Sequence, residues 1–286
     1  MAQSVIDQLN DQGFVILRNF LDRNVISAVR GALEKWVDTQ ARELMDAGRI
    51  DDPFDHEPFE TRLAKLYESC LDHAPHSLRR QLHWPGMFGL FFHPGTLDLV
   101  ESILGPEIRL YPNYTVRPKL PDHVATQVLW HQDAGYTESG QHGRDAASAD
   151  MTVTQLRMVN AWAPLVPAHP NNGCMKFIPG THHLGIVAHT QKNPYYLEIV
   201  DQALQPHLAD AVDVITDPGD LVLFSNMLFH MGQPNRSQTV RWSCDWRYQD
   251  ATQSTMRSHG GHIARSVTHP DRTVTTAEQW ARLSFV

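Results

Sequence analysis

The feature that most constrains the fold is a series of short strand-like runs that begins near residue 107. These runs are apolar or alternate between apolar and polar residues, and Gly, Pro and Asn residues separate them. They occupy residues 108–111, 113–117, 126–130, 153–164, 175–178, 212–216, 221–224 and 239–248. Many short strands divided by turn residues are typical of an antiparallel sandwich or barrel. We therefore expect a mainly β fold for this part of the chain.

The first 106 residues show a helical pattern instead. Apolar residues at helical spacing predict a helix that ends near Gly13, a short strand over 14–17, and a second helix capped by Asp22. Two more helices are expected over 63–69 and 96–104. No repeat or obvious linker divides the chain. We expect one domain over residues 1–286, in which a helical N-terminal part, a β core and a C-terminal tail occupy about 1–106, 107–250 and 251–286.

Two stretches interrupt the strand-like series. Residues 134–150 are polar and have no apolar period, and residues 193–211 are compatible with a helix or a lid. Long loops inside a compact domain are uncommon and tend to be functional. Tyr136, Tyr195 and Tyr196 are therefore candidates for a lid over a site.

Composition argues against several classes of protein. The chain has 24 Lys and Arg residues against 32 Asp and Glu residues, a net charge of −8, whereas nucleic-acid readers carry a basic excess or stripe. Its most apolar stretch, 221–229, is much shorter than a membrane span, and the N-terminus lacks a signal-peptide pattern. Three widely spaced cysteines argue against a disulfide framework and a cysteine zinc site. We expect a cytoplasmic protein without a nucleic-acid or membrane partner.

Histidine is abundant, with 17 residues, and it is the commonest metal ligand. In the segment His131-Gln132-Asp133, the outer two residues would point to the same side of a strand, where both could bind one metal ion. With this composition about two His-x-Asp/Glu matches are expected by chance, and the chain has a second one at His269 and Asp271. A proline lies inside that second match and no histidine follows it, so we interpret it as chance.

The surroundings of the first match favour a metal site. His230 follows the buried-strand signal at 221–224, and two histidines with one carboxylate form the facial triad of non-haem Fe(II) oxygenases. Arg241 follows in an alternating run, and a buried arginine suits bidentate recognition of a carboxylate. A 2-oxoglutarate site needs this combination, because the keto acid chelates iron while its far carboxylate meets an arginine.

Several short motifs follow one another along the chain. They are Gly13-Phe14-Val15-Ile16-Leu17, His131-Gln132-Asp133, Asn160-Ala161-Trp162-Ala163-Pro164-Leu165, Asn172-Gly173-Cys174, Ile178-Pro179-Gly180-Thr181-His182, Pro218-Gly219-Asp220, His230 and Arg241. Together they resemble the phytanoyl-CoA dioxygenase family over about residues 10–250. The resemblance implies a mainly β fold with a helical N-terminal part, namely a double-stranded β-helix (jelly roll, cupin-like).

The resemblance also implies a metal site and a cosubstrate site. Fe(II) would be held by His131, Asp133 and His230, and Arg241 would bind the far carboxylate of 2-oxoglutarate. Halogenating relatives have Ala or Gly in place of the carboxylate ligand, which this chain keeps. One departure is Gly232, where some relatives have a hydroxyl two residues after the distal histidine. The pattern therefore lacks one expected contact to the far carboxylate.

Other residues have two interpretations. The resemblance places Trp162 and Asn113 beside the cosubstrate, but Trp162 is equally compatible with an ordinary core residue. Arg241 has Asp245 and Asp220 as alternative partners. The choice between these interpretations depends on contacts that the sequence does not give.

The implied function is that of an Fe(II)- and 2-oxoglutarate-dependent dioxygenase. Such an enzyme oxidises, most commonly hydroxylates, an unactivated C–H bond of a small-molecule substrate, with O2 as second cosubstrate and with succinate and CO2 as coproducts. Secondary metabolism and catabolism are both compatible with it. The alternative is a jelly-roll metal protein without oxygenase activity, either a metal-dependent hydrolase or isomerase or a small-ligand binding protein. Arg241 together with Trp162 favours the oxygenase, whereas substrate and oligomeric state do not follow from the sequence.

Overall fold

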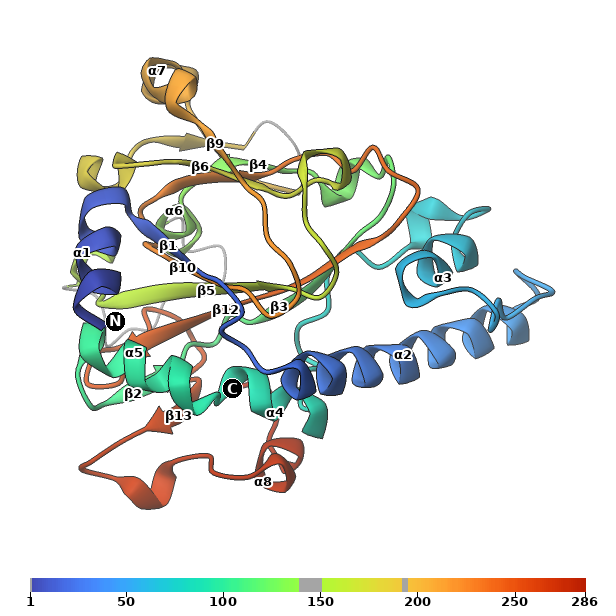
Figure 1. The fold of residues 1–286 in the computed structure, drawn as a ribbon, viewed down its shortest axis with the longest axis horizontal. Coiled ribbons are helices and arrows are strands. Elements are labelled where there is room, and N and C mark those ends of the chain that lie inside the picture. Colours follow the sequence, from blue (N-terminus) through green and yellow to red (C-terminus); the bar gives the residue numbers. More distant parts are fainter. Residues whose placement is uncertain (1, 139–150, 192–194) are drawn as a thin grey trace.

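The structure, a computed structural model, describes residues 2–138, 151–191 and 195–286. Two antiparallel sheets lie face to face in it (Figure 1). Aromatic side chains from both sheets pack between them, and the ring centroids of Phe14 and Phe177 are 5.0 Å apart. The predicted mainly β fold with a helical N-terminal part, a double-stranded β-helix or jelly roll, is confirmed.

Within the described residues the larger sheet has seven strands and the smaller has four. In hydrogen-bonded order the larger sheet contains β1 (Phe14–Leu17), β10 (Leu221–Phe224), β5 (Met158–Pro164), β12 (Arg241–Asp250), β2 (Ile108–Leu110) and β13 (His262–Arg265), and β3 (Thr115–Lys119) also pairs with β12. The smaller sheet contains β4 (Val128–His131), β11 (Phe229–Gly232), β6 (Met175–Ile178) and β9 (Val212–Val214). A separate ribbon joins β7 (His189–Thr190) and β8 (Glu198–Ile199). Each predicted run overlaps one of these strands, but β11, β13 and the ribbon were not predicted.

Helices cover the outer face of the larger sheet. In Figure 1, α2 (Arg23–Asp46), α4 (Pro85–Phe91) and α5 (Pro94–Leu104) lie along this face, and α1 (Ala2–Gln12) leads into β1 at its edge. The remaining helices are α3 (Phe59–Leu66), α6 (Asp133–Glu138), α7 (Asp201–Leu204) and α8 (Ala277–Arg282). The sequence did not predict α4, α6 or α8, because helices of six or seven residues are too short to show a clear apolar period.

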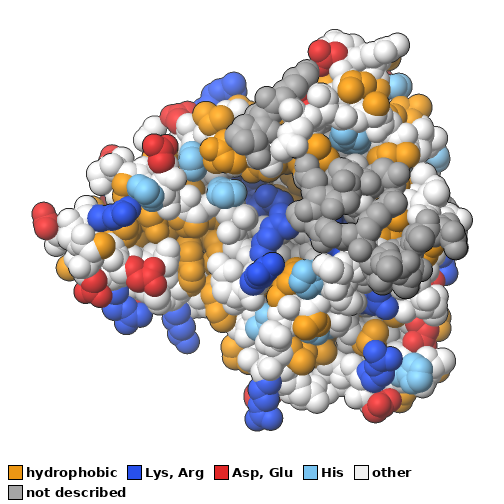
Figure 2. Space-filling view, turned by 180° about the vertical axis from the view of Figure 1, so that it is seen from behind, with side chains coloured by type: hydrophobic (Ala, Val, Ile, Leu, Met, Phe, Trp, Pro, Cys, Tyr) orange, Lys and Arg blue, Asp and Glu red, His pale blue; other side chains and the backbone are white. Residues whose placement is uncertain are grey.

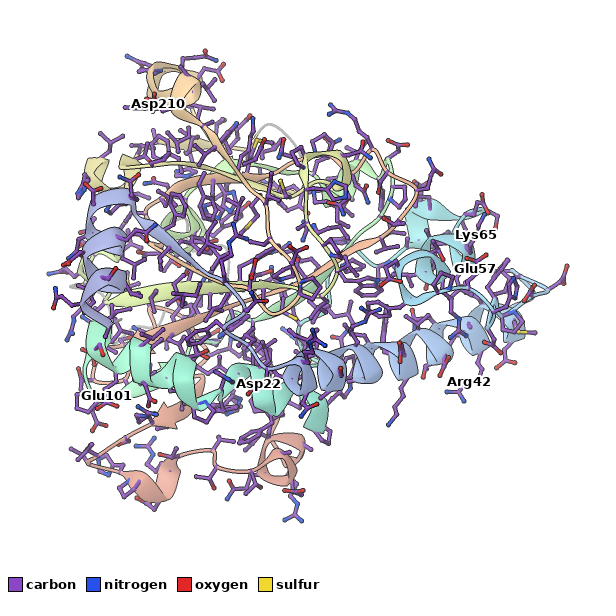
Figure 3. All side chains as sticks on the ribbon, in the orientation of Figure 1. Asp22, Arg42, Glu57, Lys65, Glu101 and Asp210 are labelled. Atoms are coloured by element: carbon purple, nitrogen blue, oxygen red, sulfur yellow. The ribbon has the colours of Figure 1, made fainter. Side chains whose placement is uncertain are left out.

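Packing rather than capping stabilises the long helix α2. Its buried residues recur three or four positions apart, at Ile26, Val29, Leu33, Val37, Ala41 and Leu44. Asp22 stands at the N-cap in an extended conformation, as predicted, and Figure 3 labels it at the start of the helix. Its side chain makes no capping hydrogen bond, so the expected stabilisation by this cap is missing.

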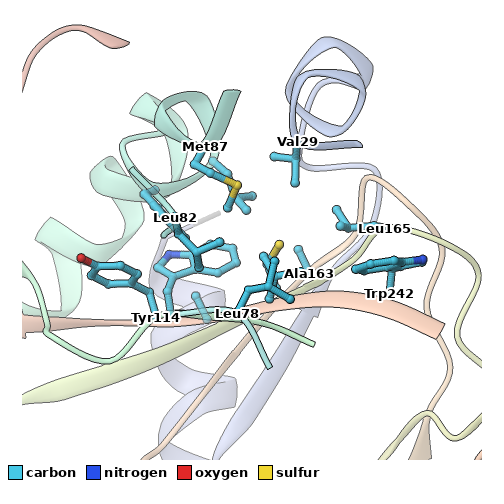
Figure 4. Packing of buried hydrophobic residues seen from close by; sticks show 14 of the residues in the cluster. Val29, Leu78, Leu82, Met87, Tyr114, Ala163, Leu165 and Trp242 are labelled. Carbon is cyan, nitrogen blue, oxygen red and sulfur yellow. The ribbon is translucent and has the colours of Figure 1, made fainter. Parts of the chain in front are cut away.

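The main core lies between these helices and the larger sheet. Val29 of α2 and Met87 of α4 lie above Ala163 and Trp242 of the sheet (Figure 4). All four side chains are fully buried. Fully burying a large apolar side chain contributes about 1.5–3 kcal/mol. This core covers one face of the larger sheet, so only the opposite face can contribute to a site between the sheets.

Strand β12 is buried on both faces although six of its ten residues are polar. The core beneath the helices contains Trp242, Cys244, Trp246 and Tyr248. Side chains alternate across a strand, so the five residues at the odd-numbered positions face the space between the sheets. They are Arg241, Ser243, Asp245, Arg247 and Gln249. Charged side chains are rarely buried without a partner or a function, and this polar row forms one wall of the candidate site.

The interruptions and the C-terminal tail differ in part from the predictions. Residues 134–138 belong to α6, and residues 139–150 lie outside the described residues. From residue 195 onward the second interruption, expected to be a helix or a lid, contains β8, the short α7 and a 3₁₀ helix over Gln205–Asp210. The tail takes part in the fold, because β13 pairs with β2 and Trp280 of α8 is in the main core. Within the described part of the chain, no helix is long and apolar enough to cross a membrane.

Candidate active site

Two facing histidines form the centre of the candidate site. His131 ends β4 and is the register partner of His230 in β11, and their ring centroids are 4.0 Å apart. His131 Nδ1 lies 2.8 Å from the carbonyl oxygen of Leu129, and His230 Nδ1 lies 2.9 Å from that of Leu228. A carbonyl oxygen only accepts, so each Nδ1 carries the proton and donates it. Both Nε2 atoms therefore keep the lone pair that a metal ion needs.

Asp133 completes the group from a helix and not from a strand. Strand β4 ends at His131 and Asp133 begins α6, so the predicted strand alternation does not explain why the two side chains meet. The turn into α6 places Asp133 Oδ1 3.6 Å from His131 Nε2, and Oδ2 3.9 Å from His230 Nε2. Ligand atoms of the three residues lie within 4.8 Å of one another, and this is the only such group found among the described residues.

Two buried side chains hold the Asp133 carboxylate. Arg247 Nη2 lies 2.5 Å from Oδ1, and Asn160 Nδ2 donates to Oδ2 at 2.7 Å. Burial raises the pKa of Asp133, but Arg247 and the two histidines outweigh it and hold this pKa well below its usual value. Burial and the neighbouring His131 lower the pKa of His230 to about 3. A charged carboxylate beside a neutral imidazole is the state that binds a divalent cation.

These two supporting residues were not predicted as part of the site. Alternation along β12 places Arg247 on the same face as Arg241, but alternation alone does not show that it contacts a ligand. Asn160 is the second residue of β5 whose side chain faces the space between the sheets, two positions before Trp162. The signal that could have found both residues is a polar side chain on the inner face of a strand that is otherwise buried.

A first cavity extends from the three candidate ligands to Arg241, and Trp162, Phe224 and Met231 also line it. Arg241 is buried, and its guanidinium carbon lies 5.5 Å from the ring centroid of Trp162. Its Nη1 donates to the Ser243 hydroxyl, whereas its Nε has no hydrogen-bond partner within the described residues. The structure therefore brings Arg241 and Trp162 to the same cavity as the candidate ligands.

The alternative partners of Arg241 bind other arginines. Asp245 Oδ2 lies 2.7 Å from Arg117 Nε, and Asp220 Oδ2 lies 2.6 Å from Arg18 Nη1. In the part of the chain that the structure describes, no carboxylate lies within 4.0 Å of the Arg241 guanidinium. A buried charge without a partner is costly. An anion that enters the first cavity would remove this cost.

A second buried cation, Lys119 of β3, lies beside Gly232. Its Nζ donates to the carbonyl oxygens of Thr126 and Gly232, the latter at 3.3 Å, and Lys119 is the register partner of Arg241. A Cβ atom added at Gly232 would lie 3.4 Å from this Nζ. Burial and Arg241 lower the pKa of Lys119 well below its usual value. Gly232, which stands where some relatives have a hydroxyl, therefore leaves room for the Lys119 amine.

A second cavity lies on another side of the candidate ligands. It shares Arg117, Val128, His131 and Asp133 with the first cavity, and its further lining includes Arg79, Asn113, Tyr136, Tyr196 and Arg247. Asn113 lines this second cavity and not the one with Arg241, and its Oδ1 accepts a hydrogen bond from Arg79 at 3.2 Å. The predicted hydrogen bond of Asn113 to the cosubstrate stays a prediction.

The family of the chain follows from its sequence as a whole. Residues 9–243 match the family model described as phytanoyl-CoA dioxygenase (PhyH). The chain belongs to the phytanoyl-CoA dioxygenase family. It is thus an enzyme of the Fe(II)/2-oxoglutarate-dependent oxygenases, and the resemblance seen in the motifs is confirmed.

Two curated proteins of this kind are similar to the chain. The 1-deoxypentalenic acid 11-beta-hydroxylase of Streptomyces arenae is 24% identical over 275 residues, which cover 92% of this chain and 84% of that protein. A probable phytanoyl-CoA dioxygenase of Caenorhabditis elegans is 26% identical over 174 residues, which cover 57% of this chain and 51% of that protein.

Solved structures show the same fold. The non-heme monooxygenase ThoJ in its apo form has a TM-score of 0.61 and 22% identity, over 96% of this chain and 85% of that one. EctD from S. alaskensis, with 2-oxoglutarate and 5-hydroxyectoine, has a TM-score of 0.56 and 16% identity, over 88% of this chain and 77% of that one. At such low identity these likenesses support the cupin-like fold of this phytanoyl-CoA dioxygenase family member and nothing beyond it.

Proposed function

We propose that this chain is an Fe(II)- and 2-oxoglutarate-dependent dioxygenase that hydroxylates an unactivated C–H bond of a small molecule. The observation that carries the proposal is one cavity that contains the His131, Asp133 and His230 group together with the guanidinium of Arg241, which has no acidic partner among the described residues. The name of the similar Streptomyces arenae protein, a hydroxylase, supports hydroxylation as the outcome.

The residues present fit both the metal and the cosubstrate. His131, Asp133 and His230 would hold Fe(II), since two neutral imidazoles and one carboxylate are its facial triad. Arg241 would bind the far carboxylate of 2-oxoglutarate with parallel N–H bonds, which gives its unpaired Nε a partner. Trp162 would form a wall beside the bound keto acid.

The protein contributes geometry, charge and exclusion of water. When bound, Fe(II) and 2-oxoglutarate together activate O2 and supply the oxidising power for the C–H bond. Arg247 and Asn160 keep the Asp133 carboxylate ionised and oriented. Phe224 and Trp162 make part of the first cavity apolar, which limits the entry of water around the cosubstrate.

Anaerobic addition of Fe(II) and then 2-oxoglutarate to the metal-free protein tests this proposal. We expect a visible charge-transfer band, because a keto acid bound through two oxygens to Fe(II) absorbs visible light. Asp133→Ala should abolish both the band and, in air, succinate formation. Asp271→Ala is the matched control, since it removes the exposed carboxylate of the second His-x-Asp motif, and it should leave both unchanged.

Arg241→Ala extends the same experiment to the cosubstrate. Iron binding should remain, while the 2-oxoglutarate concentration that gives half of the band should rise by about 10–100-fold, the loss of a charge-assisted contact. An unchanged requirement would remove Arg241 from the cosubstrate site. Bound iron without any band in the unaltered protein would reject the oxygenase and favour a jelly-roll metal protein with another activity.

A further inference from the structure

Arginine side chains concentrate at the second cavity. Arg79, Arg117 and Arg247 line it, and Figure 2 shows Lys and Arg side chains gathered at a hollow near the middle of one face. Arg257 is close enough for its charge to act on Arg79 and Arg247, and its Nε and Nη2 have no hydrogen-bond partner within the described residues. The cavity has a volume of about 130 Å³, which is enough for a small polar group such as a carboxylate.

The carboxylates in the described part of the chain neutralise only part of this charge. Asp245 pairs with Arg117 at 2.7 Å, and Asp133 pairs with Arg247 at 2.5 Å. Under the proposed function Asp133 also binds Fe(II), so its single negative charge is shared between a dication and Arg247. The walls of the second cavity therefore keep an excess of positive charge when metal and cosubstrate are bound.

Arg79 is the lining cation without an acidic partner. Among the described residues no carboxylate lies within 4.0 Å of its guanidinium, and Nη1 donates to the neutral amide oxygen of Asn113. Burial and the neighbouring Arg117 lower the pKa of Arg79 to about 10, so the side chain is still charged at neutral pH. Two backbone hydrogen bonds between Leu78 and Val116, at 2.8 and 2.9 Å, fix the segment that carries it.

We propose that Arg79 binds a carboxylate of the substrate and that the enzyme therefore oxidises a small carboxylic acid. This inference rests on the proposed function and names its substrate class. A carboxylate matches the planar fork of a guanidinium, and one negative charge gives Arg79 the acidic partner that it lacks among the described residues. Asp133 lines the same cavity, so an acid held at Arg79 would extend its carbon skeleton toward the metal.

The test uses the enzyme with Fe(II) and saturating 2-oxoglutarate under anaerobic conditions, so that Arg241 is already occupied. Octanoate, octanamide, octylammonium and octyl phosphate are titrated as probes that differ only in the head group. Binding is followed by the change of the charge-transfer band and by calorimetry. We expect octanoate to bind at least about tenfold tighter than octanamide, since a charged hydrogen-bond partner is worth more than a neutral one. Octylammonium should not bind.

Variants of Arg79 and of its neighbour Arg80 show which residue causes the preference for octanoate over octanamide. Arg79→Gln should bind octanoate and octanamide equally well, while its charge-transfer band and 2-oxoglutarate requirement stay normal. Arg79→Lys should keep part of the preference, because it restores the charge without the fork. Arg80→Gln is the matched control: Arg80 is the exposed neighbour, so this variant should behave as the unaltered protein does. A normal charge-transfer band also shows that a variant is folded. If Arg79→Gln lacks this band, the comparison of octanoate with octanamide is made in Arg79→Lys instead.

Each contrary outcome has a distinct meaning. A normal band with equal binding of octanoate and octanamide, or with no binding of octanoate, overturns the carboxylic-acid inference and leaves the proposed function standing. Tighter binding of octyl phosphate overturns the carboxylate in favour of a phosphate. An octanoate preference that survives in Arg79→Gln excludes Arg79 as the binding residue. Absence of the band in the unaltered protein overturns the proposed function itself.

Discussion

Two residues that are not candidate ligands fix the orientation of the Asp133 carboxylate. Asn160 is 1% exposed, and its Nδ2 donates to Asp133 Oδ2 at 2.7 Å. Arg247 holds the other oxygen. A carboxylate fixed by two donors is aimed before the metal arrives, so less conformational freedom is lost on binding. Residues of this kind are invisible to a search for ligand motifs, because asparagine and arginine do not bind iron.

Replacing Asn160 therefore should weaken metal binding without removing a ligand. We expect Asn160→Ala to lower the affinity for Fe(II) by about 10–100-fold, the usual effect of losing a hydrogen bond to a metal ligand. Anaerobic titration of the metal-free protein with Fe(II) measures it. Asn172→Ala is the control, because Asn172 is also buried but donates to the carbonyl oxygen of Pro167. Equal affinities in both variants would show that Asn160 does not support Asp133.

At the level of secondary structure, the two faces of the larger sheet have different roles: one face contributes to stability, and the other contributes to the site. One of its faces packs on the helices through residues such as Trp242 and Trp246. The other face carries Arg241 and Arg247 toward the cavities. Alternation along β12 produces both faces from one strand, since successive side chains point in opposite directions. A change on the helical side is therefore expected to alter stability and to leave the site intact.

A substitution in α2 tests this separation. Leu33 is fully buried in the main core, so Leu33→Ala should lower the free energy of unfolding by about 2–5 kcal/mol through lost packing and a cavity. The exposed neighbour gives the control, and Glu34→Ala should stay within about 0.5 kcal/mol. Urea unfolding measures both variants. The charge-transfer band of folded Leu33→Ala should be unchanged, and its loss would mean that α2 shapes the site.

For the whole molecule, the C-terminal tail is joined to the core through a buried histidine cluster. His262 of β13 lies with its Nε2 3.4 Å from His83 Nε2, and His83 stacks on Trp280 of α8 with ring centroids 4.1 Å apart. Burial and the nearby His83 lower the pKa of His262 to about 4. The folded protein therefore keeps His262 neutral where an unfolded chain would protonate it.

This shift predicts a loss of stability in mild acid. Between about pH 6.5 and 4 the unfolded state binds a proton at His262 that the folded state does not, so the free energy of unfolding falls as the pH falls through this range. His262 contributes up to about 3 kcal/mol to that fall. Denaturant unfolding at several pH values should give a shallower dependence for His262→Gln. The exposed His269→Gln should keep the original dependence, and identical slopes for His262→Gln would refute the assignment.

The sequence by itself determined the features that neighbouring residues control. Turn residues between short apolar runs predicted most strands of the jelly roll, although not β11, and the spacing of residues such as Val29 and Leu33 predicted α2. Family motifs named His131, Asp133 and His230 before their positions were known. These predictions depend on local periodicity and on residue chemistry, which a linear sequence carries directly.

Only the tertiary structure decided which of these residues meet. Asp133 reaches the histidines through the turn into α6, and Asn160 and Arg247 reach Asp133 from two other strands. Arg79 joins the second cavity from a segment outside the β core. Such contacts join residues that are far apart in the chain, and no local pattern encodes the sheet register or the helix entry that creates them. The physical reason is that burying these polar groups costs free energy, and the packing of the whole molecule offsets that cost. The segment in which each residue lies does not offset it alone.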